Sequence, residues 1–452
     1  MPSWALWRWP CFGLAAATAS EGAESFEDFV QRFHRSYEAG SREFEERHRI
    51  FQARAEEVQA LNRRPSRRWT AGLGPLADYR DEELQALRGW RGTAGSQADD
   101  PSALVQVRSL PEHFNWTSLA ALREVASQEP WRQSGKLVES GVSQSKVATW
   151  AVGLAGQLRV VLGRDECRGF DGSCRDQRPA AELLSSGSPA AELVDCVPNP
   201  KHCGGKGGCT GATVELAMSY AMHVGLRKES EMPYKAKSSE CGLQSLQPAP
   251  STLQTAAAFN QDSGHEALDV KDQYRAQVEE DLAALAYLHE HSDLQAPRVH
   301  RAAADSAGLG FGLQGWEKLP PNRQEPLLRA LYERGPVGVS VAATNWHLYA
   351  SGVFDHCGKD SVIDHAVTLI GYGRDSKSGD LFYLIQNSWG SNWGEGGRIR
   401  ILRSDADDSQ QCGWDRQPEK GTACTGDPAQ VRVCGMCGIL YDSVVPHFGT
   451  LQ

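Results

Sequence analysis

The segment Asp364-His365-Ala-Val-Thr-Leu-Ile-Gly-Tyr-Gly373 and the later segment Gln386-Asn387-Ser-Trp389-Gly390 decide the fold of this chain. Each joins an apolar run, typical of a β-strand, to a Gly-rich turn. His365 begins the first run and Asn387 ends the second, so pairing the two strands in one sheet would bring their side chains together. An amide oxygen there fixes the tautomer of an imidazole, as the third member of a catalytic triad does. The alternative is that His365 is a buried histidine with a structural role only. The aromatic and glycine residues on both sides of it favour a catalytic site.

Strand and helix patterns divide the chain into two parts. After residue 335, apolar runs between Gly-rich turns predict strands at 337–341, 366–370, 381–385 and 399–402. Before it, apolar residues at helical spacing predict helix over 25–62, over 145–162 and around 274–288. Helices followed by strands are typical of an α+β chain with two segregated lobes.

Composition narrows the class of protein. The chain has 452 residues, long enough for two or three folding units, and 40% of them are hydrophobic and 23% charged. Its net charge is −10, so the chain lacks the broad cationic field that attracts nucleic acid, and no nucleic-acid partner is expected. No apolar run reaches the roughly 18 residues of a membrane span.

The cysteines and the N-terminus indicate an oxidising compartment. Twelve cysteines include two close pairs, Cys167 with Cys174 and Cys203 with Cys209, and neither pair has the second ligand set of a zinc site. We therefore expect disulfides, and neither a metal nor a cofactor is predicted. Residues 1–20 carry an apolar run that ends in small residues, as in a signal peptide. Passage through the secretory pathway would follow, to the outside or to a lysosome-like or vacuole-like compartment.

The His365 and Asn387 segments resemble those of papain-family cysteine peptidases, the group that includes the cathepsins. Other segments are similar to the same family: Leu110-Pro-Glu-His-Phe-Asn-Trp116 to the start of the mature enzyme, and Gly335-Pro-Val337 to the start of its barrel lobe. The resemblance implies an α+β, two-lobed fold, with a helical lobe and a β-barrel lobe. It also implies peptide-bond hydrolysis between the lobes, with His365 as the base, Asn387 as its orienter and Trp389 as a shield over the pair.

An inhibitory propeptide is implied upstream. The ERFNIN pattern of such propeptides is matched by Glu43, Arg47, Phe51, Val58 and Asn62, with Arg54 in place of its first Asn. The GNFD pattern is matched by Gly72, Gly74, Leu76 and Asp78, where Gly74 replaces the Asn and Leu76 replaces the Phe. We therefore expect a propeptide at 21–90 that lies in the chain's own cleft. A linker with the processing region would follow at 91–108, and then a peptidase domain at 109–452 with an insertion at about 246–312.

The catalytic cysteine of the family has no counterpart here, because residues 12–166 contain no cysteine. Alignment from the preceding segment places its position at Ser140, alignment from the following helix places it at Ser145, and a third alignment at Lys146. The glutamine that the family uses in its oxyanion hole falls near Ser134 or Glu139, so this donor is also absent or displaced.

A serine hydroxyl in place of the thiol is one interpretation of this segment. The hydroxyl is far harder to deprotonate than a thiol of pKa about 8.5, so it would need general-base assistance from His365 during attack. The alternative is that Ser143 or Ser145 caps the following helix, a position that serine favours.

Disulfide pairs are implied by the same resemblance. Cys196 is expected to pair with Cys241, and Cys357 with Cys437. The family joins Cys209 to a cysteine just before the nucleophile, which is absent here, and Cys203 offers a local replacement as its partner. Cys167 and Cys174 would form a further local pair.

Three functions stay open on the sequence alone. The first is a peptidase whose nucleophile is Ser140 or Ser145. The second is a non-catalytic relative that keeps the cleft to bind peptides or proteins. The third is that the expressed protein carries a cysteine that this translated sequence lacks, through an error in the gene model around residues 117–150. The retained His365, Asn387 and propeptide favour catalysis, whereas the missing cysteine and glutamine favour binding.

Overall fold

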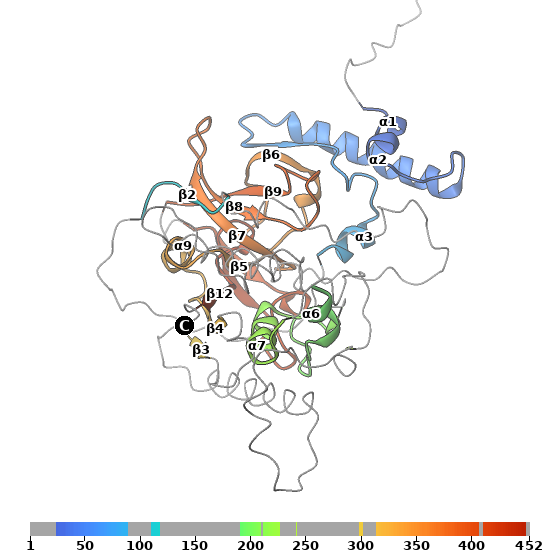
Figure 1. Ribbon diagram of the computed structural model, residues 1–452. Coiled ribbons are helices and arrows are strands. Elements are labelled where there is room, and N and C mark those ends of the chain that lie inside the picture. Colours follow the sequence, from blue (N-terminus) through green and yellow to red (C-terminus); the bar gives the residue numbers. More distant parts are fainter. Residues whose placement is uncertain are drawn as a thin grey trace, which may run out of the picture.

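The computed structural model describes residues 24–88, 110–117, 190–208, 211–226, 241, 298–301, 313–405 and 410–448 (Figure 1). The predicted signal peptide, the predicted linker and the predicted helices at 145–162 and 274–288 lie outside these residues. Most of the predicted insertion at 246–312 lies outside them as well. Its last part contributes a described strand, β3 (Arg298–Arg301), that pairs with β4 (Leu313–Lys318).

A sheet of ten strands organises the described residues, in the order β1-β6-β9-β8-β7-β5-β12-β4-β3, with β2 paired to β7. All neighbouring pairs are antiparallel except β6 and β9, which are parallel. The remaining bounds are β1 (Trp69–Ala71), β2 (Phe114–Asn115), β5 (Val337–Val341), β6 (Tyr349–Phe354), β7 (His365–Arg374), β8 (Leu381–Gln386), β9 (Arg398–Leu402) and β12 (Ser443–Phe448).

The four strands predicted from the sequence are confirmed as β5, β7, β8 and β9. In β8 buried and half-buried residues alternate, because only one face of this strand meets the core. All five residues of β5 and the first nine of β7 are buried, which matches their almost continuous apolar runs. These two strands therefore form the centre of the sheet, and β7 begins with His365.

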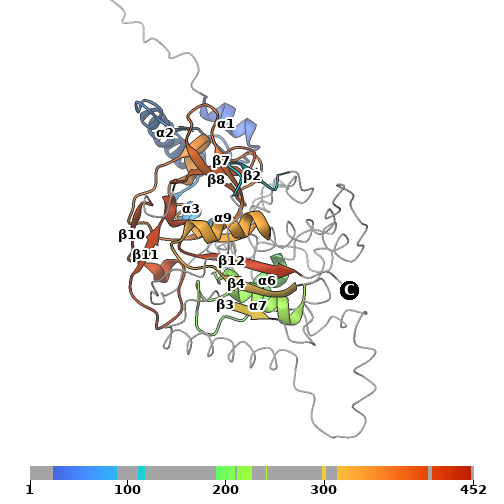
Figure 2. The ribbon, with the colours of Figure 1, turned by 90° about the vertical axis from the view of Figure 1, so that its left-hand side faces the viewer.

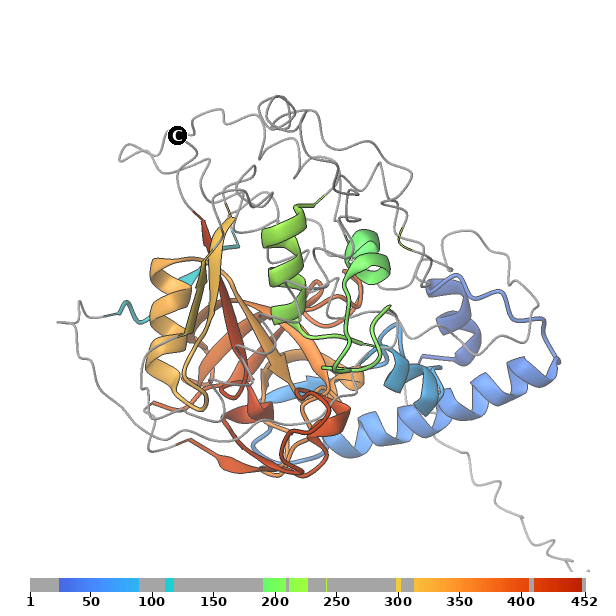
Figure 3. The same cartoon turned by 90° about the horizontal axis from the view of Figure 1, so that it is seen from below.

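Helices cover the sheet at separate places. α9 (Gln324–Glu333) packs on β5 and β7, and α7 (Val214–Val224) packs on β4 and β12. Figure 2 shows α7 and α6 (Ala190–Cys196) at the end of the sheet opposite α1 and α2. Figure 3, seen from below, shows α7 and α6 apart from the long α2. This is the segregated α+β arrangement predicted from the sequence.

The single helix predicted over 25–62 is wrong, because the structure contains two. α1 (Phe26–Arg32) and α2 (Arg42–Asn62) are separated by a break in which His34 and Gly40 have positive φ. Ser25 and Ser41 each cap the helix that follows, accepting a backbone N–H in its first turn. The apolar residues at helical spacing on the two helices still meet, since Phe26, Phe29 and Phe51 are buried together.

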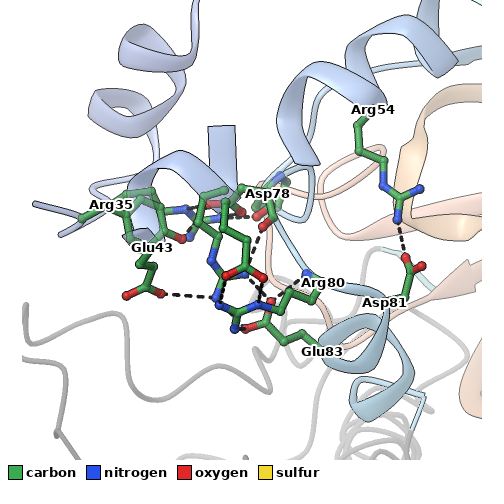
Figure 4. A network of polar contacts seen from close by, with 11 residues as sticks. Arg35, Glu43, Arg54, Asp78, Arg80, Asp81 and Glu83 are labelled. Carbon is green, nitrogen blue, oxygen red and sulfur yellow. Dashed lines mark hydrogen bonds and ion pairs between the residues drawn. The ribbon is translucent and has the colours of Figure 1, made fainter. Parts of the chain in front are cut away.

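Buried ion pairs join α2, and the break that precedes it, to the segment that follows α2 (Figure 4). The Arg47 guanidinium forms two contacts with the Glu83 carboxylate, and both side chains are 4% exposed. The Arg35 guanidinium donates two hydrogen bonds of 2.8 Å to the Asp78 carboxylate. Glu83 lies in α3 (Asp81–Ala86), so the Arg47–Glu83 pair ties α3 to the long helix. Arg47 belongs to the ERFNIN pattern and Asp78 to the GNFD pattern, and this network explains why both patterns include a charged residue.

The N-terminal segment also adds a strand to the sheet. β1 pairs with β6 in an antiparallel register that sets Trp69 opposite Gly352. The Asn62 side chain holds β1 from the other side, donating to the Ala71 carbonyl at 2.8 Å and accepting from the Ala71 N–H at 3.0 Å. Residues 24–71 are thus attached to the sheet by backbone hydrogen bonds.

Four disulfides connect described residues. Two are the expected pairs, Cys196–Cys241 and Cys357–Cys437. The proposed pairing of Cys203 with Cys209 is wrong, because Cys203 bonds to Cys424 instead. The reason is a long-range approach of two backbone segments: the Gly204 N–H donates to the Ala423 carbonyl at 3.1 Å, and the Thr425 N–H to the Lys201 carbonyl at 2.9 Å.

The fourth disulfide, Cys412–Cys434, was not foreseen. It closes the first residue pair of a separate hairpin, β10 (Cys412–Asp415) with β11 (Val431–Cys434). Cys434 and Cys437 therefore bond to different partners, and their CxxC spacing is not a redox motif. Cys167, Cys174 and Cys209 lie outside the described residues. Among the described helices, none is long and apolar enough to cross a membrane.

We predict that Arg47→Met destabilises the N-terminal segment by about 3–5 kcal/mol, because it leaves the buried Glu83 carboxylate without its cation. The matched control is Arg54→Met, whose partner Asp81 is 88% exposed, and we expect it to cost no more than about 1 kcal/mol. Denaturant unfolding of the full chain with a probe at Trp69 measures both. Equal effects of the two substitutions would contradict the role of the Arg47–Glu83 pair.

Candidate active site

His365 and Asn387 meet where β7 and β8 pair. His365 is the first residue of β7, opposite Val341 of β5, and Asn387 directly follows β8, whose last residue Gln386 lies opposite Thr368. This register places the two side chains on one face, and the His365 Nε2 atom lies 2.8 Å from the Asn387 Oδ1 atom. Both residues are buried. The structure thus brings together the two residues on which the predicted site rests.

The hydrogen bonds of Asn387 define the tautomer of His365. Asn387 Oδ1 also accepts the Ser388 backbone N–H at 2.9 Å, so this oxygen is an acceptor toward both groups. A neutral His365 must then carry its proton on Nε2, which leaves a lone pair on Nδ1. Nδ1 is buried and has no hydrogen-bond partner among the residues that the structure describes. The imidazole is therefore arranged to accept a proton at Nδ1.

Two tryptophans enclose the imidazole. The Trp389 ring lies 5.1 Å from the His365 ring at a tilt of 34°, and the Trp346 ring meets it edge to face at 5.9 Å. Burial among these rings lowers the pKa of His365 to about 4; the Asn387 hydrogen bond opposes this shift and the nearby Arg88 guanidinium adds to it. His365 is consequently neutral over most of the pH range. The Trp389 ring thus lies against the His365 ring, and its role as a shield over the pair stays a prediction.

Backbone contacts fix the segment that carries His365. The Asp364 N–H donates to the Val341 carbonyl at 3.0 Å, and the Asp364 Oδ1 atom accepts the Ala343 N–H at 2.9 Å. One residue earlier, the Ile363 N–H donates to the buried Asp415 carboxylate at 2.9 Å. Burial raises the pKa of Asp415 to about 6, although its hydrogen bonds oppose the shift. The position of His365 thus depends on β5 and on the β10–β11 hairpin.

Sequence reasoning missed the parts played by Asp364 and Asp415. Asp364 directly precedes His365, so its place in the quoted motif was an available signal. Asp415 lies 50 residues after His365 in a segment without a recognisable pattern, and no sequence signal indicated it. Ser134, Ser140, Ser145 and Lys146 lie outside the described residues. Within the described parts of the chain, no group of three or more His, Cys, Asp or Glu residues is placed to hold a metal ion.

Comparison with known families agrees with this arrangement. The sequence profile described as "Papain family cysteine protease" matches residues 180–283 and 270–422, which together are more than half of the chain. The profile of the cathepsin propeptide inhibitor domain matches residues 26–84. The chain therefore belongs to the papain family of cysteine peptidases and has the propeptide domain of that family.

Individual relatives agree at low identity. "Cysteine protease XCP2" of Arabidopsis thaliana is 23% identical over 403 residues, which cover 86% of this chain and 83% of the relative. "Chymopapain" of Carica papaya is 38% identical over a shorter stretch of 122 residues, 26% of this chain and 33% of the relative.

Solved proenzyme structures share the fold. A "recombinant stem bromelain precursor" has a TM-score of 0.55 at 19% identity and covers 94% of this chain and 98% of that structure. A digestive procathepsin L 3 from the larval midgut of Tenebrio molitor has the same TM-score at 20% identity, with the same two coverages. The expected papain-like α+β fold with a propeptide is confirmed.

We predict that the His365 ring titrates near pH 4 in NMR spectra of the full chain, well below its ordinary value of 6.5. Asn387→Ala should lower this pKa further, because the lost hydrogen bond favours the protonated ring, and Arg88→Ala should raise it. Since the folded ring binds its proton more weakly than the unfolded one, this residue's share of stability is complete above pH 6.5. It is lost as the pH falls toward 4. A titration near 6.5 would contradict the enclosed site.

Proposed function

We propose that the protein is a peptide-bond hydrolase in which His365 acts as a general base. The supporting observation is the His365–Asn387 pair: a buried neutral imidazole whose Nε2 is occupied and whose Nδ1 has no partner in the described residues. Asn387 would hold the ring in this tautomer, and Trp389 would keep water from the pair. Membership of the papain family supports the reaction class.

The nucleophile in this proposal is a hydroxyl, on Ser140 or Ser145. Papain-family enzymes use a thiol, and residues 12–166 of this chain contain no cysteine. A thiolate–imidazolium pair needs a histidine that retains its proton, whereas a serine needs a neutral histidine that takes the proton during attack. Burial lowers the pKa of His365, so the ring is neutral before attack, which is the protonation state that the second chemistry starts from. The hydroxyl oxygen would bond to the peptide carbonyl carbon while its proton passes to Nδ1. The C–N bond would then break and the amine leave with that proton, and a water deprotonated by His365 would hydrolyse the acyl ester and restore the hydroxyl.

A second candidate is a protein that binds peptides without cleaving them. It is favoured by the sequence itself, which lacks both the family's cysteine and, near Ser134 and Glu139, its oxyanion glutamine. Loss of one oxyanion donor alone costs on the order of a hundredfold or more in rate. The third possibility, a cysteine lost from the translated sequence, is decided by reading the messenger across residues 117–150.

The proposed location is a secretory compartment, either outside the cell or lysosome-like or vacuole-like. Four disulfides among the described residues fit oxidising conditions. The proposed partners are a peptide or protein substrate and the chain's own propeptide, which would occupy the substrate cleft until it is cut within 91–108.

The test is hydrolysis of a fluorogenic peptide pool at acidic and neutral pH. The full chain is folded with a recognition sequence for a site-specific protease inside 91–108 and is then cut there. We predict turnover that falls at least about a hundredfold in His365→Ala, which lacks the general base, and in the double variant Ser140→Ala/Ser145→Ala, which lacks the nucleophile. Ser143→Ala is the matched control and should retain turnover.

Turnover that survives either variant would contradict the proposed mechanism. A folded sample that binds the peptides and cleaves none would favour the second candidate.

A further inference from the structure

An arginine from the N-terminal segment lies beside the candidate base. Arg88 follows α3, and its Nε atom is 3.0 Å from the Asp364 Oδ2 atom. Its Nη1 atom donates to the Thr344 carbonyl at 3.3 Å. The two charged side chains are 15% and 14% exposed, so the pair is largely removed from water. The guanidinium is therefore bound one residue away from His365.

The acceptors around Arg88 are held by the sheet and the loops that follow its strands. We call the Asp364 carboxylate and the Thr344 carbonyl the acceptor pair. Asp364 Oδ1 accepts the Ala343 N–H at 2.9 Å, and Oδ2 accepts the Thr344 hydroxyl at 3.2 Å. The backbone of Asp364 is fixed to Val341 of β5. None of these contacts involves residues 24–88, so the acceptor pair is fixed without Arg88.

The charge of Asp364 is balanced by Arg88. Among the described residues, Arg88 is the cation that forms an ion pair with this carboxylate. Burial raises the pKa of Asp364, and the Arg88 guanidinium acts against that shift. Without a cation the Asp364 carboxylate would have only two neutral hydrogen-bond donors. A mostly buried carboxylate that lacks a paired cation is unfavourable in its ionised form.

The contact of Arg88 is ionic rather than an aligned hydrogen bond. Its Nε–H has no hydrogen-bond acceptor in good geometry, although the Oδ2 atom is close. The acceptor pair thus has capacity for a better-aligned guanidinium. Arginine presents several N–H donors in one plane and suits a carboxylate beside a carbonyl, whereas lysine is a single charge.

We propose that the acceptor pair is a binding site for an arginine side chain of a bound peptide, and that Arg88 fills this site in the uncut chain. Asp364 is then a specificity-determining residue that favours peptides with arginine next to the bond that His365 serves. This inference rests on the proposed peptide-binding function. Its first test measures binding without catalysis, so the arginine site can fail or succeed independently of the hydrolase proposal.

The test empties the site in the intact full chain. Arg88→Ala removes the guanidinium, and the probe is propylguanidinium, which has the charged group and the chain length of an arginine side chain. Propylurea is the neutral probe of the same shape. We expect NMR titration to detect propylguanidinium at Arg88→Ala with an affinity about tenfold or more above that of propylurea. The unsubstituted chain, whose site is filled, should bind neither.

Two further variants make the result specific. Arg88→Ala/Asp364→Asn keeps an acceptor for the Ala343 N–H but removes the charge, and it should lose the preference for the guanidinium probe. Arg54→Ala, which removes an arginine paired with the exposed Asp81, is the matched control and should gain no binding.

Equal affinity for the two probes at Arg88→Ala, or an undiminished preference after Asp364→Asn, would overturn the proposal. If the double variant does not fold, the comparison of the two probes at Arg88→Ala still tests the proposal. Peptide hydrolysis without a preference for arginine over citrulline would overturn the arginine site and leave the hydrolase proposal standing. Guanidinium binding in a chain that cleaves nothing would support the arginine site and contradict the hydrolase proposal.

Discussion

The register of β5, β7 and β8 is the constraint on which the rest of the structure depends. Val341 lies opposite His365, and Thr368 opposite Gln386, so one pairing pattern sets both the start of β7 and the end of β8. A slip of one residue would turn every side chain of a strand to the other face. His365 would then lose Asn387, and the apolar residues of β7 would lose the core. Burial of the sheet and geometry of the site are therefore maintained by the same hydrogen bonds.

The N-terminal segment is held beside His365 by contacts with the sheet and by ion pairs within the segment itself. Backbone pairing of β1 with β6 and the ion pairs of Arg68 with Asp355 and Asp380 attach it to the sheet at β6 and next to β8. Beyond β1 the chain is shaped by the buried Arg47–Glu83 pair, which fixes α3, and α3 leads directly to Arg88. The charge beside Asp364 is thus positioned by charges buried inside the propeptide. Such a connection explains why the sequence patterns of the propeptide include Arg47 and Asp78.

Much of the sheet could be predicted from the sequence because its signals are local. Apolar runs between glycine turns gave β5, β7, β8 and β9, and the motif residues gave His365, Asn387 and Trp389. What could not be predicted depends on contacts between distant segments. Cys203 pairs with Cys424 across 221 residues, whereas Cys209 is only six residues away and attracted the prediction. Asp415 supports Ile363 through a hairpin with no pattern of its own. The break between α1 and α2 was missed because apolar residues at helical spacing continue from one helix to the other.

The identity of the nucleophile decides between a hydrolase and a binding protein, and covalent labelling tests it most directly. The full chain, cut within 91–108, is treated with a peptidyl fluorophosphonate, whose fluoride is displaced by an activated hydroxyl. Peptide mapping by mass spectrometry then locates the adduct. A hydrolase with His365 as its base predicts one adduct, on Ser140 or Ser145, that disappears in His365→Ala. A folded sample that gains no adduct, or one whose labelling is unchanged in His365→Ala, would contradict it.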